Sequence, residues 1–131
     1  SFVQYLPKLR VLILATNKIT DITPLSGLAE LEYLELFINY VTDVKPLSGL
    51  SKLAYLNIAR TGVTDVTPLE SMKQLKMLWI MNNKIEDANL KTLAEALPDC
   101  TISTRGSNST ANGWYDTEIY REFREKSGLP E

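Results

Sequence analysis

Residues 9–30 read LRVLILATNKITDITPLSGLAE, and the same pattern returns three more times at a step of 22 residues. The later copies are LEYLELFINYVTDVKPLSGLSK over 31–52, LAYLNIARTGVTDVTPLESMKQ over 53–74 and LKMLWIMNNKIEDANLKTLAEA over 75–96. A partial fifth copy, LPDCTI, places Leu97, Cys100 and Ile102 in the leading apolar columns. Self-similarity at this period indicates a stack of coils, in which neighbours bury the core that one copy cannot bury alone.

Each copy opens with Leu-x-x-Leu-x-Leu or a close variant, an alternation that predicts a half-buried strand. In the first copy Leu12 and Leu14 would point inward. A polar column follows the strands, made of Asn17, Asn39, Thr61 and Asn83. A side-chain amide there is expected to bond the backbone of its own turn and of the neighbouring coil. Since Thr61 can donate only one such bond, we expect the third coil to be locally weaker.

The second half of each copy predicts a short helical turn on the opposite side of the stack. Pro24, Pro46 and Pro68 share one column, which suits the first turn of a helix, and Thr23 and Thr67 are the expected N-caps. The fourth copy has no such proline and predicts a longer helix. Its expected N-cap is Asp87, and its expected apolar face is Leu90, Leu93, Ala94 and Leu97.

The pattern L-x-x-L-x-L-x-x-N-x-I-x-D-I-x-P-L-x-x-L-x-x resembles the 22-residue leucine-rich repeats of the internalin-like and phosphatase-regulatory type. The resemblance covers about residues 2–103. It implies an α/β solenoid, a right-handed superhelix with a parallel sheet on its concave face and short 3-10 or α turns on its convex face. The end of the chain resembles the ends of repeat proteins from gut-type Gram-positive bacteria. The family further implies a cell-surface or secreted bacterial setting.

The two ends of the chain differ from the repeats. Residues 1–8 align with the tail of a preceding repeat, 9–103 hold four full coils and a terminal strand, and 104–131 hold a polar loop and a C-terminal helix. We expect that helix to run from Asp116 to about Ser127, to stop at Gly128 and to cap the last coil. A linker or docking helix is the alternative. The first strand would leave an open edge, for which we expect self-association.

Composition excludes several classes of function. Net charge is −2 without a basic stripe, so we expect no nucleic-acid partner, and no apolar run approaches the roughly 20 residues that span a bilayer. There is no histidine, the commonest general base near neutral pH. Cys100 occupies a core column and is expected to be a buried, inert thiol. We therefore predict no enzyme and no cofactor.

The outward side chains of the predicted sheet suggest a binding surface. On an open sheet these positions are mostly polar, yet here they include aromatic residues and methionines, which interfaces favour. The candidate contact residues are Tyr33, Glu35, Phe37, Tyr55, Asn57, Arg60, Met77, Trp79 and Met81. We predict a protein or peptide ligand on the concave face. The alternatives are a sheet-stabilising aromatic ladder in an architectural spacer or stalk, and a glycan site at Trp79, Asn57 and Glu35.

Two further patterns have a structural explanation beside a functional one. A column of carboxylates runs through Asp21, Asp43, Asp65 and Asp87, which raises a calcium hypothesis. We instead expect each aspartate to accept a backbone N–H at the start of its return turn. Asn108-Ser109-Thr110 matches the glycosylation acceptor pattern in a loop, although matches of three residues are common by chance.

Overall fold

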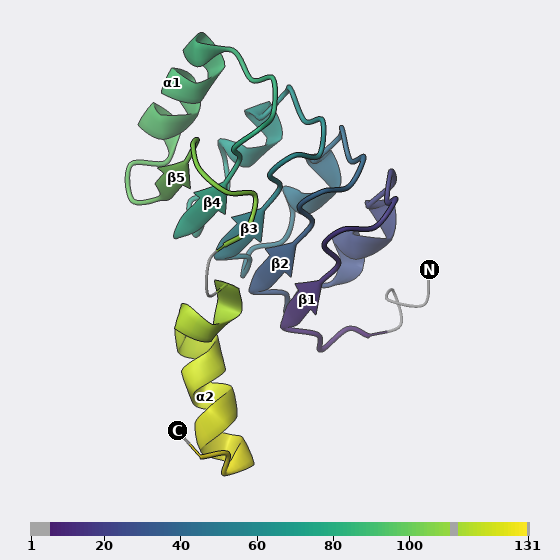
Figure 1. Cartoon of the computed structure of the whole chain (residues 1–131), viewed down its shortest axis with the longest axis vertical. Coiled ribbons are helices and arrows are strands. Elements are labelled where there is room, and N and C mark those ends of the chain that lie inside the picture. The colour runs from purple at the N-terminus through teal and green to yellow at the C-terminus, as the bar shows by residue number, and fades with distance from the viewer. Residues whose placement is uncertain (1–5, 111–112, 131) are drawn as a thin grey trace.

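The computed structural model describes residues 6–110 and 113–130. It is a solenoid whose five strands form one parallel sheet in the order β1-β2-β3-β4-β5 (Figure 1). The strands are β1 (Val11–Ile13), β2 (Tyr33–Glu35), β3 (Tyr55–Asn57), β4 (Met77–Trp79) and β5 (Thr101–Ser103). The predicted fold class, a leucine-rich-repeat solenoid with a parallel sheet and short helical turns, is confirmed.

The register of the sheet follows the repeat until the last strand. Leu12 pairs with Leu34, Leu34 with Leu56 and Leu56 with Leu78, a step of 22 residues each time. Leu78, however, pairs with Ile102, which is a step of 24. The fourth coil returns through α1 (Asp87–Ala96), a ten-residue α-helix in place of a 3-10 turn. The expected alignment of Cys100 with Leu78 is therefore wrong by two residues, because the longer return segment delays the strand.

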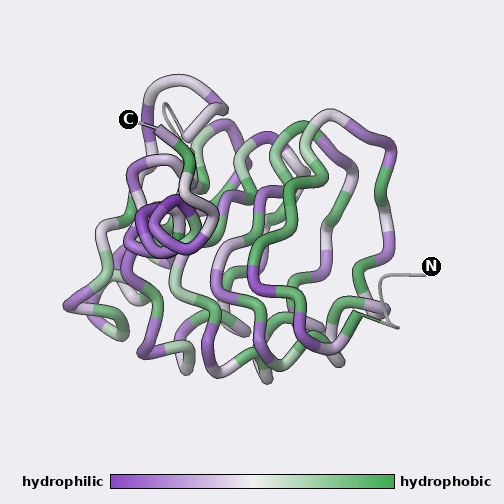
Figure 2. The backbone as a smooth tube through the Cα atoms, turned by 90° about the horizontal axis from the view of Figure 1, so that it is seen from below, coloured by the Kyte–Doolittle hydropathy of each residue, from purple (hydrophilic) through white to green (hydrophobic). Residues whose placement is uncertain are grey.

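The inward leucines form one continuous core along the stack. Leu34, Leu56 and Leu78 are fully buried, whereas Leu12 in the first coil is only partly buried. Figure 2 shows the coils stacked side by side, with the largely hydrophilic α2 seen end-on. Each interior leucine packs against both neighbouring coils, so burial is complete only where a coil has a neighbour on each side.

The polar column joins the coils to one another. Asn39 Nδ2 donates to the carbonyls of Leu14 and Leu36, both at 2.9 Å, and its Oδ1 accepts the Ile19 N–H at 3.0 Å. Asn83 makes the equivalent pair of bonds to Ile58 and Ile80 at 2.8 and 3.2 Å.

The third coil differs at this column, because Thr61 Oγ1 donates to Ile58 at 2.7 Å, within its own coil. The second and third coils therefore lack the amide bridge that joins the first to the second and the third to the fourth. This arrangement fits the expectation that the third coil is weaker.

The convex side carries the 3-10 turns η2 (Thr23–Gly27), η3 (Lys45–Leu47) and η4 (Thr67–Leu69). Their caps are Ile22, Val44 and Val66, so the prediction of threonine N-caps is wrong. Asp21, Asp43 and Asp65 each accept the backbone N–H two residues later, at 2.9–3.0 Å. The side chain and backbone of Thr67 lower the pKa of Asp65 through these bonds.

The return-turn explanation of the aspartate column is thus confirmed for these three residues. Groups of three or more His, Cys, Asp or Glu side chains able to hold a metal ion are not found among the described residues. The calcium hypothesis gains no support.

The helix α1 departs from its prediction in detail. Asp87 is its first residue and Glu86 is its N-cap, with no side-chain capping bond. Leu93 and Leu97 are buried in the core, as expected. Ala94 is exposed, and Ala96 packs against the core instead.

The C-terminal part forms the 3-10 turn η5 (Gly113–Asp116) and the helix α2 (Glu118–Ser127). Thr117, not Asp116, is the N-cap of α2, and its side chain accepts the Tyr120 N–H at 3.2 Å. Gly128 ends the helix in the left-handed conformation at φ 64°, as predicted. Within the described residues no helix is long and apolar enough to cross a membrane.

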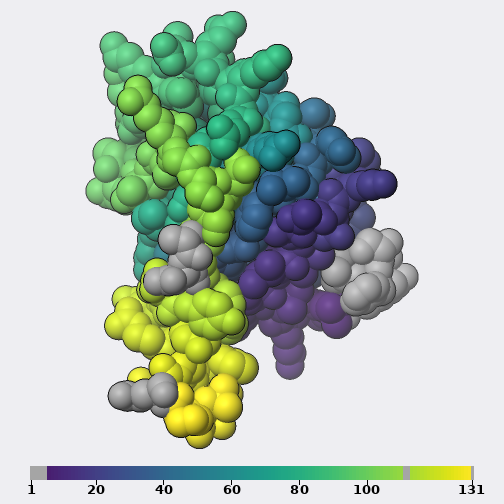
Figure 3. All heavy atoms as spheres, in the orientation of Figure 1, coloured from purple at the N-terminus to yellow at the C-terminus, as the bar shows by residue number. Residues whose placement is uncertain are grey.

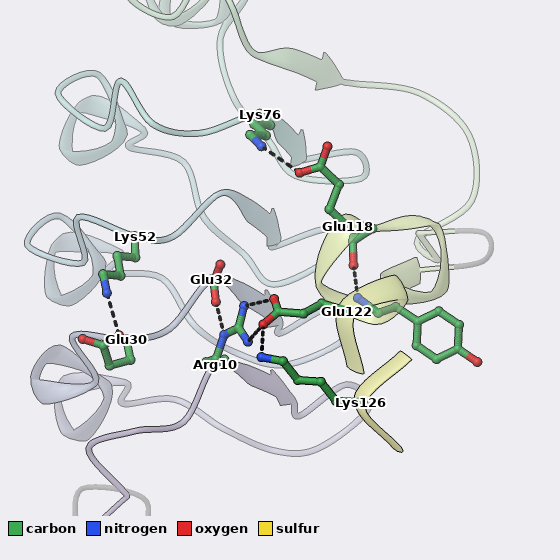
Figure 4. Close-up of polar contacts among 10 residues, drawn as sticks. Arg10, Glu30, Glu32, Lys52, Lys76, Glu118, Glu122 and Lys126 are labelled. Atoms are coloured by element: carbon green, nitrogen blue, oxygen red, sulfur yellow. Dashed lines mark hydrogen bonds and ion pairs between the residues drawn. The ribbon is translucent and has the colours of Figure 1, made fainter. Parts of the chain in front are cut away.

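The expected position of α2 over the last coil is wrong. Figure 1 places α2 below the sheet, beside the N-terminal ends of the strands. The ion pairs agree, because Glu122 bonds Arg10 in the first coil and Glu118 lies 4.0 Å from Lys76 in the fourth (Figure 4).

Candidate functional site

The concave face is built from three rows of outward side chains that cross the strands. The register aligns Tyr33 with Tyr55 and Met77 in one row, and Glu35 with Asn57 and Trp79 in the next. The rings of Tyr33 and Tyr55 lie 5.9 Å apart, centroid to centroid. A third row begins just past the strands and holds Phe37, Ala59 and Met81. The repeat therefore brings the predicted contact residues onto one side of the sheet.

The chain's own C-terminal segment crosses this face. We call residues 104–110 and 113–117 the strap: the first part leaves β5 and lies across the sheet, and the second part leads into α2. Asn57 Nδ2 donates to the Asn108 carbonyl at 3.0 Å, and Asn82 Nδ2 donates to Asn108 Oδ1 at 2.5 Å. Figure 3 shows the light-green segment after β5 lying over the teal and blue coils. The strap is thus bonded to the centre of the concave face.

A buried polar cluster fastens the strap to β2. Thr110 Oγ1 donates to Glu35 Oε1 at 2.7 Å, and Tyr33 donates its hydroxyl to the same carboxylate oxygen. Burial, followed by the bond to Glu35, raises the pKa of Tyr33. A Cβ added at Gly113 would lie 2.7 Å from Thr110 Oγ1 and 3.0 Å from Glu35 Oε1, so only glycine fits against the cluster.

Ion pairs hold α2 against the N-terminal ends of the strands. Arg10 binds both carboxylate oxygens of Glu122, at 2.8 and 3.2 Å, and also donates to Glu32 (Figure 4). Lys126 donates to Glu122 at 2.6 Å. The bonds from Arg10 and then Lys126 lower the pKa of Glu122 to about 2.

Aromatic packing completes the attachment. Trp114 meets Tyr120 edge-to-face at a centroid distance of 4.8 Å and lies 5.8 Å from Phe123. Ile119 on the same helix is buried. The predicted apolar face of the helix therefore exists, although it packs beside the first coil.

The strap changes which predicted contact residues a partner could reach. Tyr33, Glu35, Asn57 and Met81 are buried in the structure, so their expected availability on an open sheet is corrected. The side chains of Phe37, Tyr55, Met77 and Trp79 are half-buried, and Arg60 is exposed. The polar residues of the strap follow no periodic pattern, so the sequence did not indicate that the strap covers these side chains. The repeat pattern reports only which way each strand residue points.

The accessible surface lies instead along the C-terminal ends of the strands. Tyr40 is 63% exposed and Ile13 is 47% exposed, and Tyr40 is not among the contact residues that the repeat pattern predicted. The chain turns away from the sheet here through one column of left-handed residues, at Thr16, Ile38, Arg60 and Asn82, with φ between 47° and 58°. Residues of this column line a pocket of about 470 Å³ together with Lys18, Tyr40 and Gly62. We call this pocket the notch.

The described residues offer little for catalysis. Cys100 is half-buried, and burial raises the pKa of its thiol to about 11, which keeps it protonated near neutral pH. Its Sγ lies 3.7 Å from the Thr101 carbonyl. The expectation of an unreactive thiol agrees with this environment.

Stacked 22-residue coils with a leucine core, a parallel sheet and 3-10 return turns define a leucine-rich-repeat solenoid. The sequence profile described as "Leucine Rich repeats (2 copies)" matches residues 7–49. No curated protein matches the chain in sequence.

Several solved structures of leucine-rich-repeat proteins are similar to this chain, and two of them are internalins. An internalin from Listeria monocytogenes (inlF) superposes with a TM-score of 0.73 at 28% identity, covering 79% of this chain and 31% of the internalin. Internalin C2 from the same species has a TM-score of 0.70 at 39% identity, with 76% and 43% covered. A leucine-rich-repeat protein of Leptospira interrogans has a TM-score of 0.66 at 31% identity, with 77% and 26% covered.

The chain therefore has a leucine-rich-repeat solenoid fold that is similar to that of the Listeria internalins. It spans less than half of each of these neighbours. Leucine-rich-repeat proteins are generally non-enzymatic scaffolds that bind other proteins. An origin in a Gram-positive bacterium and a cell-surface setting stay predictions.

Proposed function

We propose that this chain is a non-catalytic scaffold that binds a protein or peptide. The observation that supports the proposal is the accessible apolar and aromatic surface along the C-terminal ends of β1–β3. It consists of Ile13, Phe37, Ile38, Tyr40 and Arg60, which we call the open margin. Apolar, aromatic and arginine side chains together are the composition of interface cores. A partner would meet this margin without having to displace the strap.

The half-buried members of the predicted set extend the proposed surface. Tyr55, Met77 and Trp79 lie on the adjacent strands β3 and β4. A partner on the open margin could contact these side chains if it continued across the sheet. Tyr33, Glu35, Asn57 and Met81 would become available only after the strap moved away.

Panning a random peptide library against the full chain tests the proposal. We expect peptides that bind the wild type and lose binding when Phe37→Asp or Tyr40→Asp is introduced. The matched control is Ser26→Asp, the same new charge on an exposed residue of the convex turn η2, which should leave binding unchanged. Peptides that bind all variants equally, or selection of no peptide, would favour an architectural spacer instead.

The glycan alternative loses two of the three residues on which it was based. The side chains of Glu35 and Asn57 are engaged with the strap, through Thr110 and the Asn108 carbonyl. They cannot bond sugar hydroxyls at the same time as they hold the strap. The geometry therefore favours a protein or peptide ligand over a sugar at this position.

Self-association at the first coil is a second candidate, favoured by the partial burial of Leu12 and Leu14 there. A second copy that covered these side chains would gain the burial that the inner coils already have. Light scattering coupled to size-exclusion chromatography should then show a mass that rises with concentration. A Leu12→Asp variant should lower that mass, and a constant monomer mass would reject the candidate.

A further inference from the structure

The notch owes its shape to one glycine in the repeat. The position after the polar column is filled by Lys18, Tyr40, Gly62 and Lys84 in the four coils. Gly62, at φ 99°, leaves this column without a side chain in the third coil. Only Thr42 comes within 4 Å of the point where its Cβ would lie, at 3.6 Å, so the space above it is open. The result is a hollow bordered by Tyr40, Ile38 and Arg60.

The charges around the notch have one sign. Lys18 and Arg60 line it, and no carboxylate is among its described lining residues. Neither cation has an ion pair with another described residue. At the N-terminal ends of the strands, Arg10 and Lys76 are both paired with glutamates of α2. The two ends of the strands therefore differ in charge. The glutamates of α2 pair with the cations at the N-terminal ends, and the cations of the notch at the C-terminal ends have no such partner in the described part of the chain.

The strap lies beside the notch at the fourth coil. Asn82, which lines the notch from that coil, donates its side-chain amide to Asn108 of the strap. The accessible lining groups include the two cations, the exposed Tyr40 ring, the side chain of Ile38 and the exposed Thr16 and Asn17. These groups suit a ligand that carries two negative charges with an apolar group between them.

We propose that the notch binds an extended acidic peptide with two carboxylates four residues apart and an apolar side chain midway between them, so that all three side chains lie on one face of the peptide. The inference rests on the proposed function and adds the chemistry of the ligand. Lys18 and Arg60 lie two coils apart, about 10 Å along the stack for strands spaced ~4.8 Å, and their repeat columns are also offset by two residues, so their separation exceeds that value. An extended peptide rises ~3.3 Å per residue, so a separation of four residues, about 13 Å, fits this span with both side chains on one face. Arg60 can hold one carboxylate through two N–H donors, and the apolar side chain packs on Tyr40.

Fluorescence anisotropy with labelled octapeptides tests the proposal. Each peptide has a glycine-serine background, one leucine and two glutamates at a separation of one, four or six residues. We expect the tightest binding at a separation of four, with affinity falling as salt is added. Arg60→Glu and Lys18→Glu should each weaken this peptide about tenfold, because each change removes an attraction and adds a repulsion.

The control variant is Lys45→Glu, the same charge reversal on the convex side, for which affinity should not change. Urea unfolding of each variant shows whether the fold is kept. Binding that ignores the glutamate separation, or that survives Arg60→Glu in a folded variant, would overturn the proposal. Tighter binding of an oligogalacturonate in the same assay would also overturn it, in favour of an acidic glycan.

The outcome separates this inference from the broader proposal. If library peptides bind the open margin but the acidic peptides do not bind the notch, only the ligand chemistry is wrong. If Phe37→Asp leaves library binding intact while the acidic series behaves as expected, the notch is a binding site and the wider apolar margin is not.

Discussion

Replacing Asn39 with alanine should destabilise the contact between the first two coils, and should cost more than Asn17→Ala or Thr61→Ala in the same column. Asn39 is 4% exposed, and its amide bonds three backbone groups at 2.9–3.0 Å. After the change, the Leu36 carbonyl and the Ile19 N–H lose this partner. The Leu14 carbonyl keeps the bond from Asn17 Nδ2 at 2.9 Å.

The expected magnitude follows from these counts. A buried polar group left without a partner costs about 1–3 kcal/mol, so two such groups should lower the free energy of unfolding by about 3 kcal/mol. Thr61→Ala removes one bond, at 2.7 Å, and should cost about 1 kcal/mol. Asn17→Ala acts at an exposed position, where water replaces the lost bonds, and should cost less than about 1 kcal/mol.

Urea unfolding monitored by circular dichroism gives the free energy of unfolding of all three variants. Asn39→Thr is the matched intermediate, because it copies the residue of the third coil and should cost about half as much as Asn39→Ala. Equal losses for Asn17→Ala and Asn39→Ala would show that bridging between coils contributes nothing beyond local turn bonds. That result would refute the reasoning, whatever the absolute values.

Four further outcomes are expected. Thr61→Asn should stabilise the chain by about 0.5–1 kcal/mol in the same urea assay, because an amide there can bond the Leu36 carbonyl as Asn39 bonds that of Leu14. The pKa of Glu122 is lowered to about 2 by the bonds from Arg10 and Lys126, so attachment of α2 should be complete above the ordinary glutamate pKa of about 4.5 and weaken as pH falls toward 2. Hydrogen exchange of α2 amides should report that loss, and Glu122→Gln should abolish the pH dependence. Gly113→Ala should shift Trp114 fluorescence to the red, because the new methyl group displaces the strap and φ is 58° there. Cys100 should react with iodoacetamide roughly a hundredfold more slowly when folded than in urea, since its pKa rises from 9.0 to about 11; equal rates would contradict this.

The repeat predicted the solenoid almost completely, because each coil is a local unit with the same apolar period. Leu34, Leu56 and Leu78 are inward and fully buried, as the alternation requires. The prediction failed where the return segment changed length. Extending the 22-residue step through α1 placed Cys100 opposite Leu78, whereas the sheet pairs Ile102 there. Helix type sets how many residues the return needs, and the periodic pattern does not encode it.

The candidate site was only partly predictable, because its accessibility depends on contacts far apart in the chain. Periodicity placed Tyr33 and Glu35 on the outer face of their strand, which is correct. It carried no information that Thr110, 75 residues after Glu35, would cover them. The bonds that hold the strap run between polar side chains such as Asn57 and Asn108, whose spacing follows no period. Those pairings become visible only in three dimensions.

The strap explains why aromatic and acidic residues can share the inner rows of this sheet. An exposed Glu35 beside two tyrosines would be an ordinary surface group, whereas the buried carboxylate needs the donors that Tyr33 and Thr110 supply. The central residues are thus matched to the chain's own segment. Recognition of another molecule therefore depends on residues that the strap does not contact. Tyr40 and Lys18 line the notch, and we expect substitutions there to alter binding without altering the fold.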